Sequence, residues 1–235
     1  MNNEIKSCFI CNVTECSIFK KSNLEFLKLI DGKKTCITYN KNQPIIFEGS
    51  RLDGVYMINS GIAKVHVKGY KGRPLILRLI KPGDISGHLP DGQNRQPVSV
   101  TAVEETGMCF IENKEFDAML ENSVSARQEL MDAVKQELKQ LEMRAIQLAQ
   151  MNVREKIVSA ILHILKSYPN NNNGKAIHIN LSRQDIADLA GTTKEQVSKT
   201  ISDFGKENLI EAKGRSLKLI DYKKMETIAD FYKGF

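Results

Sequence analysis

The five cysteines are the first candidates for chemistry, because three of them fall within nine residues near the N-terminus. These three are spaced Cys8-x2-Cys11-x4-Cys16, and Cys36 and Cys109 follow much further along the chain. Clustered thiolates bind iron–sulfur clusters or zinc, and they also carry out thiol redox reactions. We therefore expect a metal or redox site near the N-terminus, whereas Cys36 and Cys109, each considered alone, are expected to be small buried residues.

Residues 181–204 carry a second recognisable pattern, that of two short helices joined by a tight turn. Ser182 and Thr193 each stand three residues before an acidic or amide side chain, which is the spacing of a capping box at a helix start. Gly191 lies between the two helices, where a left-handed backbone conformation is needed. The pattern predicts a helix-turn-helix, the second helix of which enters the major groove of DNA.

The first turns of that second helix would present polar side chains to base edges. A lysine can donate to guanine, a glutamate can accept from cytosine, and a serine can pair with several bases. Residues 209–220 then predict a β-hairpin with basic residues beside its glycine turn, where a wing would meet phosphates. The expected DNA-contacting residues are Ser182, Arg183, Thr193, Lys194, Glu195, Ser198, Lys199, Lys213 and Arg215.

A long helix is predicted upstream of this motif, over residues 123–150. Its apolar residues recur at alternating spacings of three and four, which is the heptad repeat of a helix that pairs with another helix. We expect the helix to form a homodimer; the alternative is a helix that packs against the protein's own barrel. The predicted dimer seam consists of Met131, Val134, Leu138, Leu141, Ala145 and Leu148.

The region from about residue 20 to 115 contains short apolar runs separated by turns with glycine or proline. Strands that recur at this spacing are typical of an antiparallel β-barrel or roll. Downstream of the long helix, an amphipathic helix begins near Asn152 and ends before Pro169. The expected strands of the roll lie at residues 55–58, 62–67, 75–79, 98–103 and 108–111.

Composition narrows the class of protein. The chain has 235 residues and a net charge of +6, and residues 152–235 hold 14 basic against 10 acidic side chains, which favours a polyanionic partner. No apolar stretch approaches the roughly 20 residues that cross a bilayer, and no secretory signal begins the chain, so we expect a cytoplasmic protein without membrane contact. No nucleophile–base pair, phosphate loop or pair of carboxylates indicates an enzyme.

Together these patterns resemble the CRP/FNR family of bacterial transcription regulators over nearly the whole chain, most specifically at residues 181–201, 61–64 and 81–84. The resemblance implies an α+β fold with an N-terminal antiparallel β-roll of the cyclic-nucleotide-binding jelly-roll type, a long dimerisation helix and a C-terminal winged helix-turn-helix. The implied partners are double-stranded DNA and a second copy of the chain, with RNA polymerase as a further candidate. The expected segments are a cysteine-rich arm (1–20), a β-roll sensor (21–122), a dimerisation helix (123–151) and a DNA-binding domain (152–235).

The resemblance also assigns roles to residues. Glu195 matches the family's base-reading glutamate, Ser198 resembles the FNR branch, and Lys199 stands where an arginine is usual. The cysteine arrangement resembles that of the FNR oxygen sensors, which implies that a [4Fe–4S] cluster is ligated by Cys8, Cys11, Cys16 and Cys109. Cluster binding would favour a dimer that binds a palindromic site. Oxygen or nitric oxide would dismantle the cluster and release the DNA.

The sequence also bears on other effectors. Cyclic-nucleotide binding in this family needs an arginine that neutralises the phosphate, but Gln96-Pro97 stands at that position and His88 replaces a glutamate. A neutral glutamine does not offset a buried phosphate charge, so a cyclic nucleotide is not expected. The alternatives for the sensor are a zinc site, thiol-redox chemistry, and haem or nitric oxide. For the whole chain, the alternative is a ligand-binding regulatory module that does not contact DNA.

Overall fold

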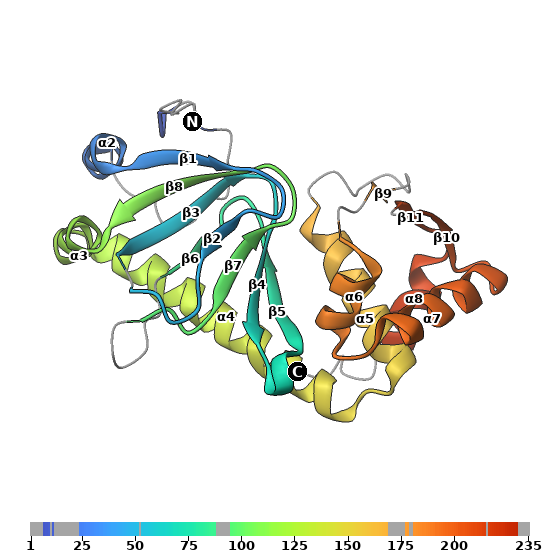
Figure 1. The fold of residues 1–235 in the computed structure, drawn as a ribbon. Helices are drawn as coiled ribbons and strands as arrows, with labels where there is room; N and C mark the ends of the chain where they lie inside the picture. Colours follow the sequence, from blue (N-terminus) through green and yellow to red (C-terminus); the bar gives the residue numbers. More distant parts are fainter. Residues whose placement is uncertain are drawn as a thin grey trace. The chain divides into compact units, whose positions relative to one another are not determined.

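A computed structural model describes residues 7–9, 11, 24–51, 53–87, 95–168, 177–178, 181–214 and 216–229 (Figure 1). The chain divides into two compact units, one formed by residues 1–67 and 79–141 and the other by residues 68–78 and 142–235. Within the described ranges, no helix is both long enough and apolar enough to cross a membrane.

Two four-stranded β-sheets form the roll that was predicted for the first part of the chain (Figure 1). One sheet has the strand order β1-β8-β3-β6, and the other has the order β2-β7-β4-β5. Strand β8 runs antiparallel to both of its neighbours, and so does β7. The strands are β1 (Thr35–Tyr39), β2 (Pro44–Ile46), β3 (Gly54–Ser60), β4 (Ala63–Lys68), β5 (Pro74–Ile80), β6 (Ile85–Ser86), β7 (Ser99–Ala102) and β8 (Thr106–Glu112).

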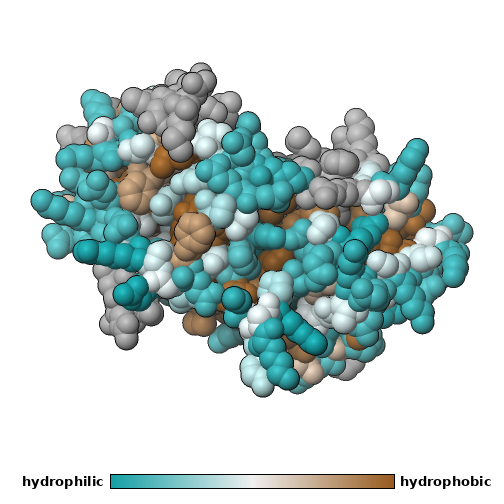
Figure 2. Space-filling model, in the orientation of Figure 1, coloured by the Kyte–Doolittle hydropathy of each residue, from teal (hydrophilic) through white to brown (hydrophobic). Residues whose placement is uncertain are grey.

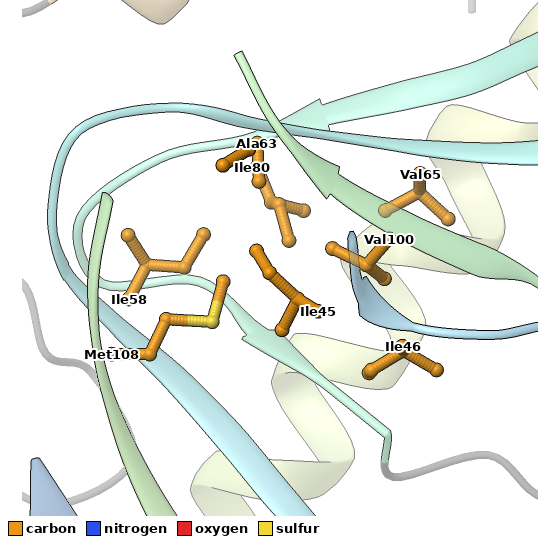
Figure 3. Close-up of a cluster of buried hydrophobic side chains, with 9 residues drawn as sticks. Ile45, Ile46, Ile58, Ala63, Val65, Ile80, Val100 and Met108 are labelled. Atoms are coloured by element: carbon orange, nitrogen blue, oxygen red, sulfur yellow. The ribbon is translucent and has the colours of Figure 1, made fainter. Parts of the chain in front are cut away.

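Apolar side chains from both sheets fill the space between them (Figure 3). Alternate residues of a strand point to opposite faces, so β4 buries Ala63 and Val65 while Lys64 and His66 stay partly exposed. The predicted turn before β4 contains Gly61 with φ of +75°, where an added Cβ would lie 2.2 Å from the carbonyl oxygen of Glu105. The buried cluster comprises Ile45, Ile46, Ile58, Ala63, Val65, Ile80, Val100, Ala102 and Met108.

A second core lies between the first sheet and the helices α2 (Leu24–Lys33), α3 (Asn113–Asn122) and α4 (Val124–Gln150). Strand β3 serves both cores, because Val55 and Met57 pack under the helices while Ile58 packs between the sheets. Its apolar run is continuous for this reason. The buried residues of this helix-side core are Ile30, Val55, Met57, Ile85, Ile111, Phe116, Met119 and Ala126.

From residue 152 onwards, the described part of the second unit combines four helices with a small sheet of order β10-β11-β9 (Figure 1). Its first helix begins where Asn152 predicted a start: the Asn152 side chain accepts from the Glu155 N–H, and the Glu155 carboxylate accepts from the Asn152 N–H. The elements are α5 (Val153–Ser167), β9 (Ile177–His178), α6 (Arg183–Ala190), α7 (Lys194–Lys206), β10 (Ile210–Lys213), β11 (Ser216–Leu219) and α8 (Tyr222–Ala229).

Candidate nucleic-acid interface and cysteine site

Reciprocal capping boxes begin both α6 and α7, as the sequence predicted. At α6, Ser182 Oγ accepts from the Asp185 N–H at 3.1 Å, and the Asp185 carboxylate accepts from the Ser182 N–H at 2.8 Å. At α7, Thr193 Oγ1 accepts from the Gln196 N–H at 3.3 Å. Between the helices, Gly191 adopts φ of 63° and ψ of 41°, the left-handed conformation that ends α6. These contacts build the predicted helix-turn-helix.

The solvent face of α7 is polar and carries charges of both signs. Val197, Ile201 and Phe204 are buried on the opposite face, because residues three or four apart share one side of a helix. The exposed residues of the first two turns include the four that were predicted to read bases, namely Lys194, Glu195, Ser198 and Lys199. The second helix of a helix-turn-helix enters the major groove with such a polar face towards the bases.

Glu195 is held in its charged form. Its own backbone N–H and the Thr193 hydroxyl donate to the carboxylate, and the positive charge of Lys194 adds to their effect, so the pKa of Glu195 is lowered. The carboxylate is therefore ionised at neutral pH, and an ionised carboxylate accepts a hydrogen bond from the amino group of cytosine.

The hairpin of β10 and β11 forms the predicted wing. Lys213 lies opposite Ser216 in the register, and Gly214 forms the turn with φ of +60°. Lys213 is exposed, whereas Arg183 is partly buried and its Nη2 donates to the carbonyl oxygen of Gly214 at 3.2 Å. Burial lowers the pKa of Arg183. In this chain Arg183 thus holds the wing turn. Of the two residues predicted to contact phosphates from the wing, Lys213 is exposed and Arg215 lies outside the described residues.

Arg154 on α5 fixes the far end of α7, although no sequence motif singles it out. Its Nη2 lies 2.6 Å from Glu207 Oε2, and its Cζ lies 4.5 Å from the centre of the Phe204 ring. The ion pair is partly exposed, so the ring contact and the packing add to what the charges contribute. Helix α7 is consequently held at both ends, by the Thr193 cap at its start and by Arg154 at its end.

A charged cluster attaches Cys8 to the C-terminal end of α2. The Cys8 N–H and the Ser7 hydroxyl donate to the Asp31 carboxylate at 2.7 and 3.0 Å. The Lys34 ammonium, with its side chain 1% exposed, lies 2.6 Å from Asp31 Oδ1 and 2.9 Å from Cys8 Sγ. Burial opposes the charge on Asp31, but hydrogen bonds from Lys34, Cys8 and Ser7 outweigh it and lower its pKa to about 2.

Cys109 on β8 lies directly opposite Cys36 on β1. Their Sγ atoms are 3.6 Å apart, and the Asn59 amide lies 3.6 Å from Cys109 Sγ on the other side. Burial raises the pKa of Cys109 to about 12. Burial also raises the pKa of Cys8, against the opposing effect of Lys34. Cys36 is buried, as expected, but its position beside Cys109 was not foreseen.

Two of the four predicted cluster ligands reach the same part of the protein, because Cys8 and Cys109 both pack against the helix-side core. Cys11 is partly exposed, and Cys16 lies outside the described residues. Across the part of the chain that the structure describes, no set of three or more cysteine, histidine or acidic side chains is arranged to hold a metal ion.

Comparison with known proteins identifies both units. Residues 36–123 match the family described as a cyclic nucleotide-binding domain, and residues 155–228 match the Crp-like helix-turn-helix domain. The chain is 25% identical over 213 residues to the transcriptional activator protein FnrL of Cereibacter sphaeroides, covering 88% of this chain and 85% of that protein. It is 24% identical over 218 residues to the anaerobic regulatory protein of Haemophilus influenzae, covering 91% of this chain and 84% of the relative.

Solved structures have the same fold. FixK2 from Bradyrhizobium japonicum aligns with a TM-score of 0.75 at 21% identity, and a CRP-family transcriptional regulator from Thermus thermophilus aligns with a TM-score of 0.72 at 21% identity. Each alignment covers 83% of this chain and 96% of the other chain. The chain belongs to the CRP/FNR family. It is a DNA-binding transcription regulator of that type, in a family of regulators and not of enzymes.

Helix α4 of this CRP/FNR regulator has two apolar faces. Ala126, Leu130 and Ala133 pack on the helix-side core, so the helix does contact its own roll. The predicted seam follows a different line, and Met131 and Leu138 on it are 54% and 57% exposed in the single chain. All six seam residues keep some exposure. The helix can therefore pack on its own roll and still offer an apolar face to a partner.

The region where a family member would bind a cyclic phosphate contains a buried neutral residue. Gln96 is 3% exposed; its N–H donates to the Ser50 carbonyl at 2.9 Å, and its carbonyl accepts from the Gly49 N–H at 2.8 Å. The neighbouring Arg95 is exposed, and its Nη1 donates to the Gly49 carbonyl at 2.6 Å. His88 lies outside the described residues. That this regulator binds no cyclic nucleotide stays a prediction, based on Gln96.

Proposed function

We propose that this regulator senses oxygen or a related oxidant through a [4Fe–4S] cluster held by Cys8, Cys11, Cys16 and Cys109. The observation that carries the proposal is the attachment of Cys8 to Asp31 and Lys34 beside the core on which Cys109 also packs. Cysteine thiolates are the usual ligands of such clusters. The resemblance to FnrL and to an anaerobic regulatory protein supports an oxygen-linked role.

The donor chemistry of the site fits such a cluster. Unligated, the Cys8 and Cys109 thiols stay protonated at neutral pH, because burial raises the pKa of both. Iron ligation requires the deprotonated form, so loading the site releases protons. The Lys34 ammonium lies 2.9 Å from Cys8 Sγ and also interacts with Cys109, and it would offset part of the negative charge of the thiolates. When bound, the cluster would supply the reaction with oxygen by which the regulator senses it.

The path from the cysteine site to dimerisation runs through the helix-side core. Cys8, Cys109 and the inner face of α4 all contact this core. Joining the N-terminal cysteines to β8 would therefore change the packing under α4 at Leu130 and Ala133. The adjacent seam, with Met131 and Leu138 exposed, is the face that a second copy would cover. A two-fold dimer would present two α7 helices to half-sites about one DNA turn apart.

Base reading in this proposal falls to Glu195, Ser198 and Lys199, which are exposed on α7. Lys213 on the wing would contact phosphate, so Lys213→Gln is expected to weaken binding to all sequences alike and to reduce the salt slope by about 1. A specificity change at one base pair after this substitution would contradict the phosphate role.

The iron and sulfide content of the purified protein tests whether the cluster is present. The full-length protein is purified without oxygen, and its iron, acid-labile sulfide and visible spectrum are compared with those of Cys109→Ala and of the matched control Cys36→Ala. We expect about four iron and four sulfide per chain for the wild type and for the control, and a large loss for Cys109→Ala. A colourless wild type that retains zinc would contradict the cluster. Full iron in Cys109→Ala would remove Cys109 from the ligand set.

A further inference from the structure

The pairing of Cys36 with Cys109 places two thiols in contact within the β1–β8 strand pair. The two residues are direct partners in the β1–β8 register, with Thr35 paired to Phe110 on one side and Ile37 paired to Met108 on the other. Directly opposite residues of antiparallel strands have Cα atoms roughly 4.5–5.5 Å apart, which lies within the range that a disulfide spans. The backbone on both sides is thus already placed for a bond.

The side chains need only a small adjustment. The Sγ atoms are 3.6 Å apart, and a disulfide bond of roughly 2.0 Å would bring them about 1.6 Å closer. Rotation of the two side chains can supply this movement without a change of register. Cys109 is the more accessible of the two, because it is partly exposed while Cys36 is 8% exposed. An oxidant would therefore react first with Cys109.

We propose that Cys36 and Cys109 form a reversible cross-strand disulfide that withdraws Cys109 from iron ligation. The oxidant is a low-molecular-weight disulfide. Cys109 first gives up its proton, and the thiolate then attacks the small disulfide, which breaks the S–S bond, releases one small thiol and forms a mixed disulfide. Cys36 sulfur then displaces the second small thiol. The two cysteine protons pass to the two released thiols, and the small disulfide is reduced by two electrons.

The consequence for sensing rests on the proposed function. A sulfur atom bonded to Cys36 is no longer a thiolate ligand, so a chain oxidised at this pair cannot complete the four-cysteine set. The cluster would return only after a thiol reductant has reopened the pair. The regulator would then have two oxidised forms, one that reloads iron at once and one that first requires reduction.

Disulfide mapping of the full-length, cluster-free chain tests the pair. The protein is incubated with oxidised glutathione, the remaining thiols are alkylated under denaturing conditions, and the linked peptides are identified by mass. We expect a peptide that joins Cys36 to Cys109, removed by dithiothreitol and absent in Cys36→Ala. If Cys109 instead remains alkylated, or is joined to an N-terminal cysteine, the proposal is wrong. The wild-type measurement decides this even if the variant folds poorly.

Reloading separates this inference from the proposed function. Reduced and glutathione-oxidised samples are given ferrous iron and sulfide without added thiol, and cluster formation is followed in the visible spectrum. We expect the oxidised wild type to load roughly tenfold less cluster than the reduced protein, and to load like the reduced protein once dithiothreitol has reopened the pair and been removed. If the reduced protein loads no cluster, the proposed function fails while the mapped disulfide stands. Equal loading of both wild-type samples overturns the inference alone.

Discussion

The helix-turn-helix and the cysteine site hold their functional residues in different ways. The caps of the helix-turn-helix join residues three apart, Ser182 to Asp185 and Thr193 to Gln196. The contacts of the cysteine site join distant residues, with Cys8 and Lys34 separated by 26 positions and Cys36 and Cys109 by 73. The reading face therefore forms with its own helices, whereas the cysteine site exists only when the roll is folded. The regulator can therefore lose its cysteine site without damage to the exposed face of α7 that is proposed to read bases.

The largest effect is expected from a substitution that leaves a cavity in the core of the DNA-binding unit. Phe204 is fully buried on the inner face of α7, so Phe204→Ala should lower the free energy of unfolding of that unit by about 3–5 kcal/mol and abolish DNA binding. Hydrogen exchange of the two units measures this, and protection in β1 and β8 should not change. The exposed neighbour substitution Lys206→Ala serves as control, with an effect within about 0.5 kcal/mol. Equal loss of protection in both units would contradict their independence.

A smaller effect is expected at the reading face. Removal of the ionised carboxylate in Glu195→Ala should weaken binding to the preferred duplex by about 1–3 kcal/mol and relax the choice of base at one position of each half-site. Binding measured by fluorescence anisotropy against duplexes that differ at single base pairs checks this. A uniform loss across all duplexes would show that Glu195 does not read a base.

Acid sensitivity tests the attachment of Cys8. The pKa of Asp31 is about 2 in the folded chain against 3.8 for an ordinary aspartate. A lowered folded pKa stabilises the fold above the unfolded pKa and loses that contribution as pH falls from about 4 towards 2. The carboxylate is partly exposed, so we expect about 1–2 kcal/mol. Urea denaturation followed by circular dichroism at a series of pH values gives the free energy of unfolding as a function of pH. It should fall between about pH 4 and pH 2 in the wild type and fall less in Asp31→Asn, and the same fall in both proteins would refute the contribution of Asp31.

The smallest effect is expected at a helix cap. Thr193→Ala removes the acceptor for the Gln196 N–H and should lower the free energy of unfolding of the DNA-binding unit by about 1 kcal/mol. Thr193→Ser keeps the oxygen and should retain most of the stability. Thermal unfolding of the three proteins provides the measurement, and an alanine variant as stable as the serine variant would show that the cap contributes little.

The sequence predicted the helix-turn-helix better than the cysteine site, because the contacts of the first are local and those of the second are not. Ser182, Gly191 and Thr193 were interpretable because capping and left-handed turns depend on residues a few positions apart. Helix α4 was predictable from its repeat. Strand β1 was not predicted, because its sequence mixes threonines with apolar residues and its burial does not alternate strictly.

The candidate site was predictable only as a list of cysteines. The contact of Cys36 with Cys109 depends on the β1–β8 register, and the role of Lys34 depends on where α2 ends beside the roll. Neither follows from local spacing. The contact between Arg183 and the Gly214 carbonyl likewise joins residues far apart in the sequence, and the DNA contact expected of Arg183 stays a prediction.

The most direct test of the account compares one protein sample before and after it meets oxygen. A palindromic duplex is enriched from random sequence by the anaerobic protein, and its affinity is measured by anisotropy at fixed salt, anaerobically and then after air has bleached the visible spectrum. We expect the loss of the cluster to weaken binding by roughly 5- to 150-fold, the range of ordinary allosteric coupling. An unchanged affinity, with the cluster demonstrably lost, would contradict the claim that the cysteine site controls DNA binding.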